Sequence, residues 1–191
     1  MKNFLLIIDV QQGFVVEGAN DNIIERIDNL IRNKVFDCVI SMAYKNSPDN
    51  HIVKLMGWKK MMNKDEQALV GLTATNSDYI INKSQYSAYS DELLNIMRNE
   101  NDGILPECVY IVGFDTECCV LKTAVDFFEA GIRPILLSYY CGASSGNDSH
   151  IAGLKSLESL IGKNNIYDQE IKNVSDLQKI IEHTQKSYYT K

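Results

Sequence analysis

The chain has 191 residues, of which 45% are hydrophobic and 23% are charged. This length and balance are typical of one folded globular domain with a buried core, and they exclude a disordered chain. The net charge of −6 provides no electrostatic basis for binding a nucleic acid or an anionic membrane.

The chain begins MKNFLLIIDVQQ, in which the apolar run is too short for a signal peptide. No apolar run in the sequence approaches the length that spans a membrane. The five cysteines are an odd number, without the spacing of a disulfide framework or a zinc site, so we expect reduced thiols. Together these features predict a cytoplasmic protein.

Short apolar runs alternate with helical patterns along the chain, which is typical of an α/β domain with a mostly parallel sheet. Repeats and linkers are absent from the sequence, so we expect residues 1–191 to form a single domain. The predicted strands cover residues 4–9, 37–44, 78–83, 108–114, 133–140 and 165–168. The predicted helices cover residues 22–33, 91–100, 119–130 and 149–162, and the tail from residue 175.

A long polar and methionine-rich stretch, residues 45–77, separates the second and third predicted strands. It contains Pro48, Gly57 and the only tryptophan, Trp58. A connection of this length without a clear periodicity is typical of lids and binding loops. We therefore expect residues 45–77 to form a loop that sets specificity.

Three reactive side chains fall at the ends of predicted strands. Asp9 ends the first strand, Lys83 ends the third, and Cys119 follows the fourth after the turn FDTEC. Ligands of open parallel sheets bind outside the carboxyl ends of the strands, so these side chains are expected to converge on one crevice.

The chemistry of the three residues fits nucleophilic catalysis. At the start of a helix, backbone N–H groups and the helix dipole would stabilise a Cys119 thiolate and an oxyanion. Asp9 in a partly apolar pocket would act as a general base, and Lys83 would hold the carboxylate and thiolate by charge. Each residue also has an ordinary explanation, as a turn carboxylate, a solvated lysine or an inert buried thiol.

The three segments resemble the isochorismatase-like hydrolases, the superfamily of nicotinamidases and N-carbamoylsarcosine amidohydrolase. LLIIDVQQGF matches D-x-Q followed by an aromatic residue, and KSQYSAY matches K-x-x-x-S-x-F at Lys83. GFDTECCV matches G-x-x-T-[DE]-x-C-V, which assigns the nucleophile position to Cys119 rather than to Cys118. The resemblance covers residues 3–160 and implies a three-layer α/β/α, Rossmann-like fold with Asp9, Lys83 and Cys119 as catalytic triad.

The resemblance also implies further site residues. A cis peptide would join Phe114 to Asp115, and the backbone N–H groups of Asp115 and Cys119 would form the oxyanion hole. Close relatives assemble as dimers or tetramers, so a homodimer or homotetramer is implied. The substrate-binding residues would be Gln11, Phe14 and Cys118, with Trp58 as a weaker candidate.

One departure from the family concerns the metal site. Metal-binding nicotinamidases carry D-x-H after the second strand, where this chain has Ala43 and Lys45. His51 stands alone in the 45–77 stretch, and His150 and His183 fall on distant predicted helices. We therefore expect no metal and no other cofactor, and we do not expect nicotinamidase activity.

The intact Cys119 favours acyl transfer through a thioester, as in the hydrolysis of an amide or ureido C–N bond of a small molecule. Two alternatives stay open. Isochorismatases proper hydrolyse a vinyl ether without needing the cysteine, and for such an enzyme Asp9 would be essential and Cys119 dispensable. A non-catalytic binding or oligomeric interaction protein of the same fold would carry a packed, unreactive thiol.

Overall fold

A computed structural model describes residues 2–16 and 21–186. Its sheet has six strands, all parallel, in the order β3-β2-β1-β4-β5-β6. The predicted parallel α/β sheet is thereby confirmed. The strands are β1 (Phe4–Ile8), β2 (Cys38–Tyr44), β3 (Tyr79–Lys83), β4 (Cys108–Gly113), β5 (Arg133–Cys141) and β6 (Ile166–Tyr167).

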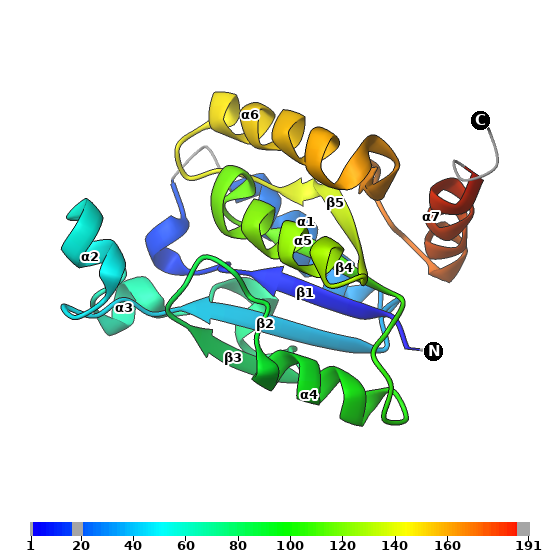
Figure 1. Cartoon of the computed structure of the whole chain (residues 1–191), viewed down its shortest axis with the longest axis horizontal. Coiled ribbons are helices and arrows are strands. Elements are labelled where there is room, and N and C mark those ends of the chain that lie inside the picture. Colours follow the sequence, from blue (N-terminus) through cyan, green and yellow to red (C-terminus); the bar gives the residue numbers. More distant parts are fainter. Residues whose placement is uncertain (1, 17–20, 187–191) are drawn as a thin grey trace.

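Helices cover both faces of the sheet and complete three layers (Figure 1). On one face, α4 (Asp91–Glu100), α5 (Leu121–Glu129) and α6 (Asn147–Leu157) contribute to one hydrophobic cluster. On the other face, α1 (Asp21–Arg32) and α7 (Val174–Lys186) contribute to the second cluster. Each helix buries an apolar stripe and leaves its polar side in solvent.

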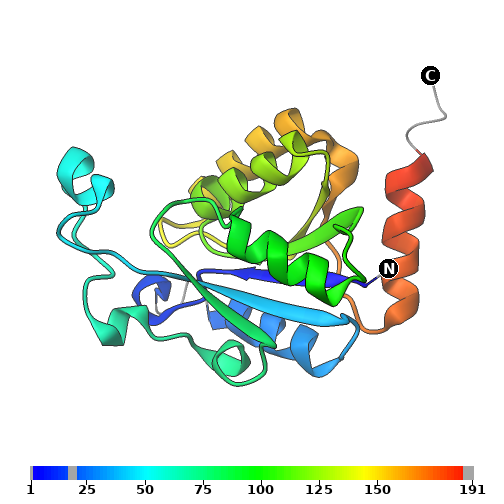
Figure 2. The ribbon, with the colours of Figure 1, turned by 60° about the horizontal axis from the view of Figure 1, so that its bottom comes forward.

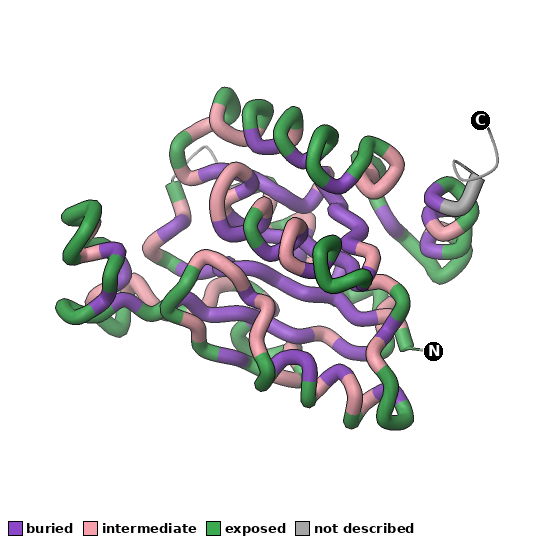
Figure 3. The backbone as a smooth tube through the Cα atoms, viewed as in Figure 1, coloured by how far each residue is buried: buried purple, intermediate pink, exposed green. Residues whose placement is uncertain are grey.

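Strand β1 lies in the middle of the core because all five of its residues are buried. Phe4, Leu6 and Ile8 enter the cluster beneath α4 and α5, whereas Leu5 and Ile7 enter the cluster beneath α1. This alternation follows from the two-residue period of a strand. Figure 3 shows the buried sheet between helices whose outer sides are exposed. A continuous apolar run is what a strand covered on both faces requires.

The 45–77 stretch contains more regular structure than the sequence predicted. It forms α2 (His51–Met56), α3 (Lys64–Gln67) and a 3₁₀ turn at Gly71–Ala74. The side chains of Asn50 and Asn63 cap the two short helices by accepting main-chain hydrogen bonds. Helices of one or two turns are too short to produce an apolar period. Figures 1 and 2 show α2 projecting beyond the carboxyl ends of the strands.

The helix predicted at residues 119–130 begins differently from the expectation. A π-helical turn, Thr116–Val120, precedes α5, so that Cys119 lies inside this turn. Among the described residues, no helix has both the length and the apolar character needed to cross a bilayer.

Candidate active site

The strand order places the candidate site where the chain changes direction across the sheet. From β1 the chain fills positions toward β3, and β4 then begins the other half. Ligands of such sheets bind at this switch point, outside the carboxyl ends of the strands. Asp9 directly follows β1, the turn with Cys119 follows β4, and Lys83 is the last residue of β3.

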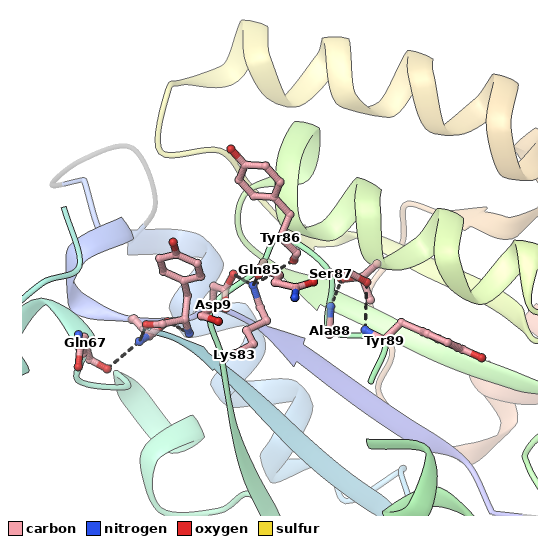
Figure 4. Close-up of polar contacts among 12 residues, drawn as sticks. Asp9, Gln67, Lys83, Gln85, Tyr86, Ser87, Ala88 and Tyr89 are labelled. Carbon is pink, nitrogen blue, oxygen red and sulfur yellow. Dashed lines mark hydrogen bonds and ion pairs between the residues drawn. The ribbon is translucent and has the colours of Figure 1, made fainter. Parts of the chain in front are cut away.

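The structure brings the three predicted residues together. The Nζ atom of Lys83 lies 2.7 Å from Oδ2 of Asp9, with side-chain exposures of 6% and 0% (Figure 4). The Cys119 thiol, itself buried, interacts with both of these groups. A nucleophile, a carboxylate and a cation thus share one buried position, as the resemblance implied.

Main-chain geometry directs Asp9 into this position. Its φ of +53° lies in the left-handed region, which aspartate tolerates better than most side chains. Its N–H donates to Met42 O at 3.0 Å, which ties the turn to β2. The Lys83 ammonium and the Cys119 thiol both interact with the carboxylate, so a cation and a proton donor lie beside it.

Burial and the ion pair act in opposite directions on Asp9. Burial raises the pKa of the Asp9 carboxyl above its usual value, and the Lys83 ammonium only partly offsets this effect. Burial lowers the pKa of Lys83, but the charge of Asp9 and the Cys119 side chain raise it by more. The result is a charged lysine beside a carboxylate that is more basic than an exposed one.

Lys83 is also held by the chain that follows it. Its ammonium donates to the carbonyl oxygens of Gln85 and Tyr86, each at 3.0 Å (Figure 4). The Nζ atom lies 5.2 Å from the centre of the Tyr44 ring, within range of a cation–π interaction. These contacts fix the direction of the ammonium toward Asp9.

The surroundings of Cys119 act on the pKa of its thiol. Its pKa is raised well above the usual thiol value, first by a hydrogen bond with Cys118, then by burial and by the charge of Asp9. The Lys83 ammonium opposes this rise. The raised pKa favours the thiol form, so a base beside it has to accept the proton when the sulfur attacks.

The turn before Cys119 contains the cis peptide bond between Phe114 and Asp115 that the resemblance implied. Phe114 is fully buried, and its N–H donates to Ile8 O at 2.8 Å. The Asp115 carboxylate accepts hydrogen bonds from the Ser144 N–H at 2.6 Å and from the Ser144 hydroxyl at 2.8 Å. The turn is thus tied to β1 and to the segment after β5.

The side-chain amide of Gln11 forms hydrogen bonds with main-chain atoms. Its Nε2 donates to Tyr44 O at 3.0 Å and to Gln67 O at 2.7 Å, and its Oε1 accepts from Tyr44 N at 2.7 Å. Both amide hydrogens are therefore committed to protein carbonyls. Through these bonds Gln11 joins the end of β2 to α3.

Aromatic side chains gather beside the triad. Phe14 and Trp58 stack with ring centres 6.3 Å apart, and the Tyr44 ring packs edge-on against both. Trp58 is half-buried, so the 45–77 segment contributes to the edge of the site. Cys118 is also half-buried, beside Cys119. Sequence reasoning missed Tyr44, although Tyr44, like Lys83, is the last residue of a predicted strand.

The resemblance placed Ala43 and Lys45 where metal-binding nicotinamidases carry D-x-H. Ala43 is buried at the end of β2, and Lys45 N donates to Lys83 O at 2.8 Å. Across the described ranges, no three His, Cys, Asp or Glu side chains come together as candidate metal ligands. His51 and His183 are exposed, whereas His150 packs against the turn that carries Cys119.

Fold and site together define an α/β protein with a cysteine–aspartate–lysine cluster at its switch point. A family model described as the isochorismatase domain matches residues 3–165. The chain therefore belongs to the isochorismatase family of hydrolases. Two Dictyostelium discoideum proteins, isochorismatase family proteins 1A and 1B, are each 30% identical to it over 87 residues. That match covers 46% of this chain and 41% of each relative, so the chain matches less than half of the relatives' length.

Solved structures share the fold along most of the chain. An isochorismatase-like hydrolase from Alkaliphilus metalliredigens superposes with a TM-score of 0.72 at 19% identity, covering 94% of this chain and 98% of that one. Nicotinamidase PncA from Bacillus subtilis gives 0.67 at 24% identity, with coverage of 87% and 99%. N-carbamoylsarcosine amidase from Thermoplasma acidophilum gives 0.70 at 18% identity, with coverage of 91% and 100%. At these identities the likeness shows the fold.

Proposed function

We propose that this protein is a metal-independent cysteine hydrolase that cleaves the C–N bond of a small amide or ureido compound. The observation that carries the proposal is the buried Asp9–Lys83 pair beside the Cys119 thiol. The cluster supplies a nucleophile, a proton acceptor and a cation, the groups that hydrolysis through a thioester uses. Structural neighbours named nicotinamidase and N-carbamoylsarcosine amidase support a C–N bond as the target.

The first half of the reaction forms a thioester. Asp9 accepts the thiol proton as the sulfur of Cys119 attacks the carbonyl carbon, because the carboxylate interacts with the thiol and its pKa is raised by burial. The carbonyl oxygen becomes an oxyanion, which the backbone N–H groups of Asp115 and Cys119 stabilise. The C–N bond then breaks, and Asp9 returns its proton to the leaving ammonia or amine.

The second half releases the acid. Asp9 takes a proton from water, the resulting hydroxide attacks the thioester, and the C–S bond breaks to regenerate the Cys119 thiol with the proton from Asp9. Lys83 stays charged throughout and stabilises Asp9 whenever the carboxylate is ionised. Phe14 and Cys118 would line the pocket, and the Phe14–Trp58 pair offers a flat apolar wall to a small planar substrate.

Ammonia release from small primary amides and ureido acids tests this proposal. The wild-type chain is compared with Cys119→Ala and Asp9→Asn, and Cys108→Ala at the opposite end of β4 serves as the matched thiol control. We expect turnover in the wild-type and control chains and none in the other two. Turnover that survives Cys119→Ala but not Asp9→Asn would instead identify the cysteine-independent route.

A further inference from the structure

A histidine on α6 contacts the turn that carries the nucleophile. His150 is half-buried, and its Nδ1 lies 2.7 Å from Oγ1 of Thr116. Thr116 is fully buried and begins the π-helical turn, three residues before Cys119. We propose that His150 is a positioning residue, which holds the Cys119 turn in its reactive geometry by donating a hydrogen bond to Thr116. The inference rests on the proposed function, since it concerns the same nucleophile.

The direction of this hydrogen bond follows from counting hydrogens. The Thr116 hydroxyl has one hydrogen, and it donates to Gly142 O at 2.9 Å. A carbonyl oxygen only accepts, so the hydroxyl cannot give the same hydrogen to His150. Nδ1 of His150 must therefore carry a hydrogen and donate it to Oγ1. Burial lowers the pKa of His150, which favours the neutral ring.

Close packing fixes the distance between α6 and the turn. A Cβ on Gly153 would lie 2.7 Å from both Cα and N of Glu117, so only glycine allows this approach. Gly153 lies three residues after His150, and residues at this spacing share one side of a helix. The backbone of the turn thus rests directly on α6, beside the histidine that bonds Thr116.

The segment before α6 holds the other side of the turn. Gly142 O accepts from both the N–H and the hydroxyl of Thr116, each at 2.9 Å, while Ser144 binds the carboxylate of Asp115. The hydrogen bond from His150 adds a contact from α6 to these contacts from the loop. The imidazole acts through Thr116, which makes its role one of positioning.

Acylation by 4-nitrophenyl acetate provides a test that needs no natural substrate. Release of 4-nitrophenolate gives the rate, mass spectrometry locates the acetyl group on Cys119, and hydrogen exchange reports the amides of residues 115–120. The variants are His150→Leu, His150→Asn, which keeps a donor near the Nδ1 position, and Thr116→Val, which removes the acceptor. His183→Leu on an exposed position of α7 is the matched control.

We expect His150→Leu to lower the maximal rate of Cys119 acylation about tenfold to a hundredfold, since small displacements of a reacting group have such effects. The half-saturating concentration should stay unchanged, His150→Asn should restore most of the rate, and His183→Leu should match the wild type. Thr116→Val should reproduce the loss, and combining it with His150→Leu should add little. Amides of residues 115–120 should exchange faster in His150→Leu.

Two results would overturn the inference: a wild-type acylation rate in His150→Leu, or equal losses in His150→Leu and His150→Asn. The hydrolase proposal fails separately, if wild-type Cys119 is not acylated at all. In that case hydrogen exchange decides the role of His150. Faster exchange of residues 115–120 in His150→Leu, but not in the control His183→Leu, would support the positioning role of His150. Unchanged exchange in His150→Leu would refute that role.

Discussion

Replacing Lys83 by methionine tests the buried ion pair directly. Methionine keeps the length and apolar stem of the side chain but removes the ammonium that lies 2.7 Å from Asp9 Oδ2. The carboxylate is then left buried without its counter-charge, and the carbonyls of Gln85 and Tyr86 lose their donor. We expect the variant to be inactive, because Asp9 would no longer be held in its ionised form.

The expected loss of stability is large because both partners are buried. Removing one member of a buried ion pair costs about 3–5 kcal/mol in the free energy of unfolding. In the Asp9→Asn, Lys83→Met double variant no charge remains unpaired, although the two carbonyl hydrogen bonds stay lost. Its destabilisation should therefore fall short of the sum of the single effects by about 2–3 kcal/mol.

The loss should also depend on pH in a defined direction. Without Lys83, the pKa of Asp9 rises further above its value in the unfolded chain, because burial then acts on it without the opposing charge of the ammonium. A group with a raised folded pKa destabilises the folded state as pH rises through that pKa. The deficit of Lys83→Met relative to the wild type should thus be smallest in acid and grow toward neutral pH, by at most about 1.4 kcal/mol per pH unit.

Urea unfolding followed by circular dichroism at several pH values measures these quantities. Lys122→Met is the control, because Lys122 forms an exposed ion pair with Asp126 on α5, and such pairs contribute about 0–1 kcal/mol. The coupling of Asp9 and Lys83 would be refuted if the stability loss of the double variant equalled the sum of the two single losses within about 0.5 kcal/mol. A deficit that does not change with pH would refute the assignment of an ionised, buried Asp9.

Three further predictions concern the surroundings of the triad. Gln11→Leu should lower the free energy of unfolding by about 3 kcal/mol or more in urea, because three main-chain groups, two of them buried, lose their partners. Gly153→Ala should cost about 1–3 kcal/mol and slow acylation of Cys119, since the new methyl group meets the backbone of Glu117; Ser156→Ala, on an exposed position of α6, should do neither. Ser144→Ala removes one of two donors to a carboxylate and should lower stability by about 1.5–3 kcal/mol; an unchanged thermal midpoint would contradict this.

The sequence by itself determined the layout of the sheet elements. The apolar runs at residues 4–9, 37–44 and 108–114 became central parallel strands, because burial on both faces demands such runs. The motifs also located Asp9, Lys83 and Cys119, since parallel strands deliver their last residues to one edge of the sheet. In the 45–77 stretch the short capped helices were not predicted, because one or two turns leave no periodic signal.

Only the tertiary structure decided what several side chains contact. Gln11 meets Tyr44 across 33 residues of sequence, and Thr116 meets His150 across 34. Neither pair follows from spacing along the chain, so Gln11 was expected at the substrate and His150 was assigned no role. The Cys119 thiol is a similar case. Its pKa depends on Cys118, on burial and on Asp9 together, and desolvation is set by the atoms that the whole fold packs around a group.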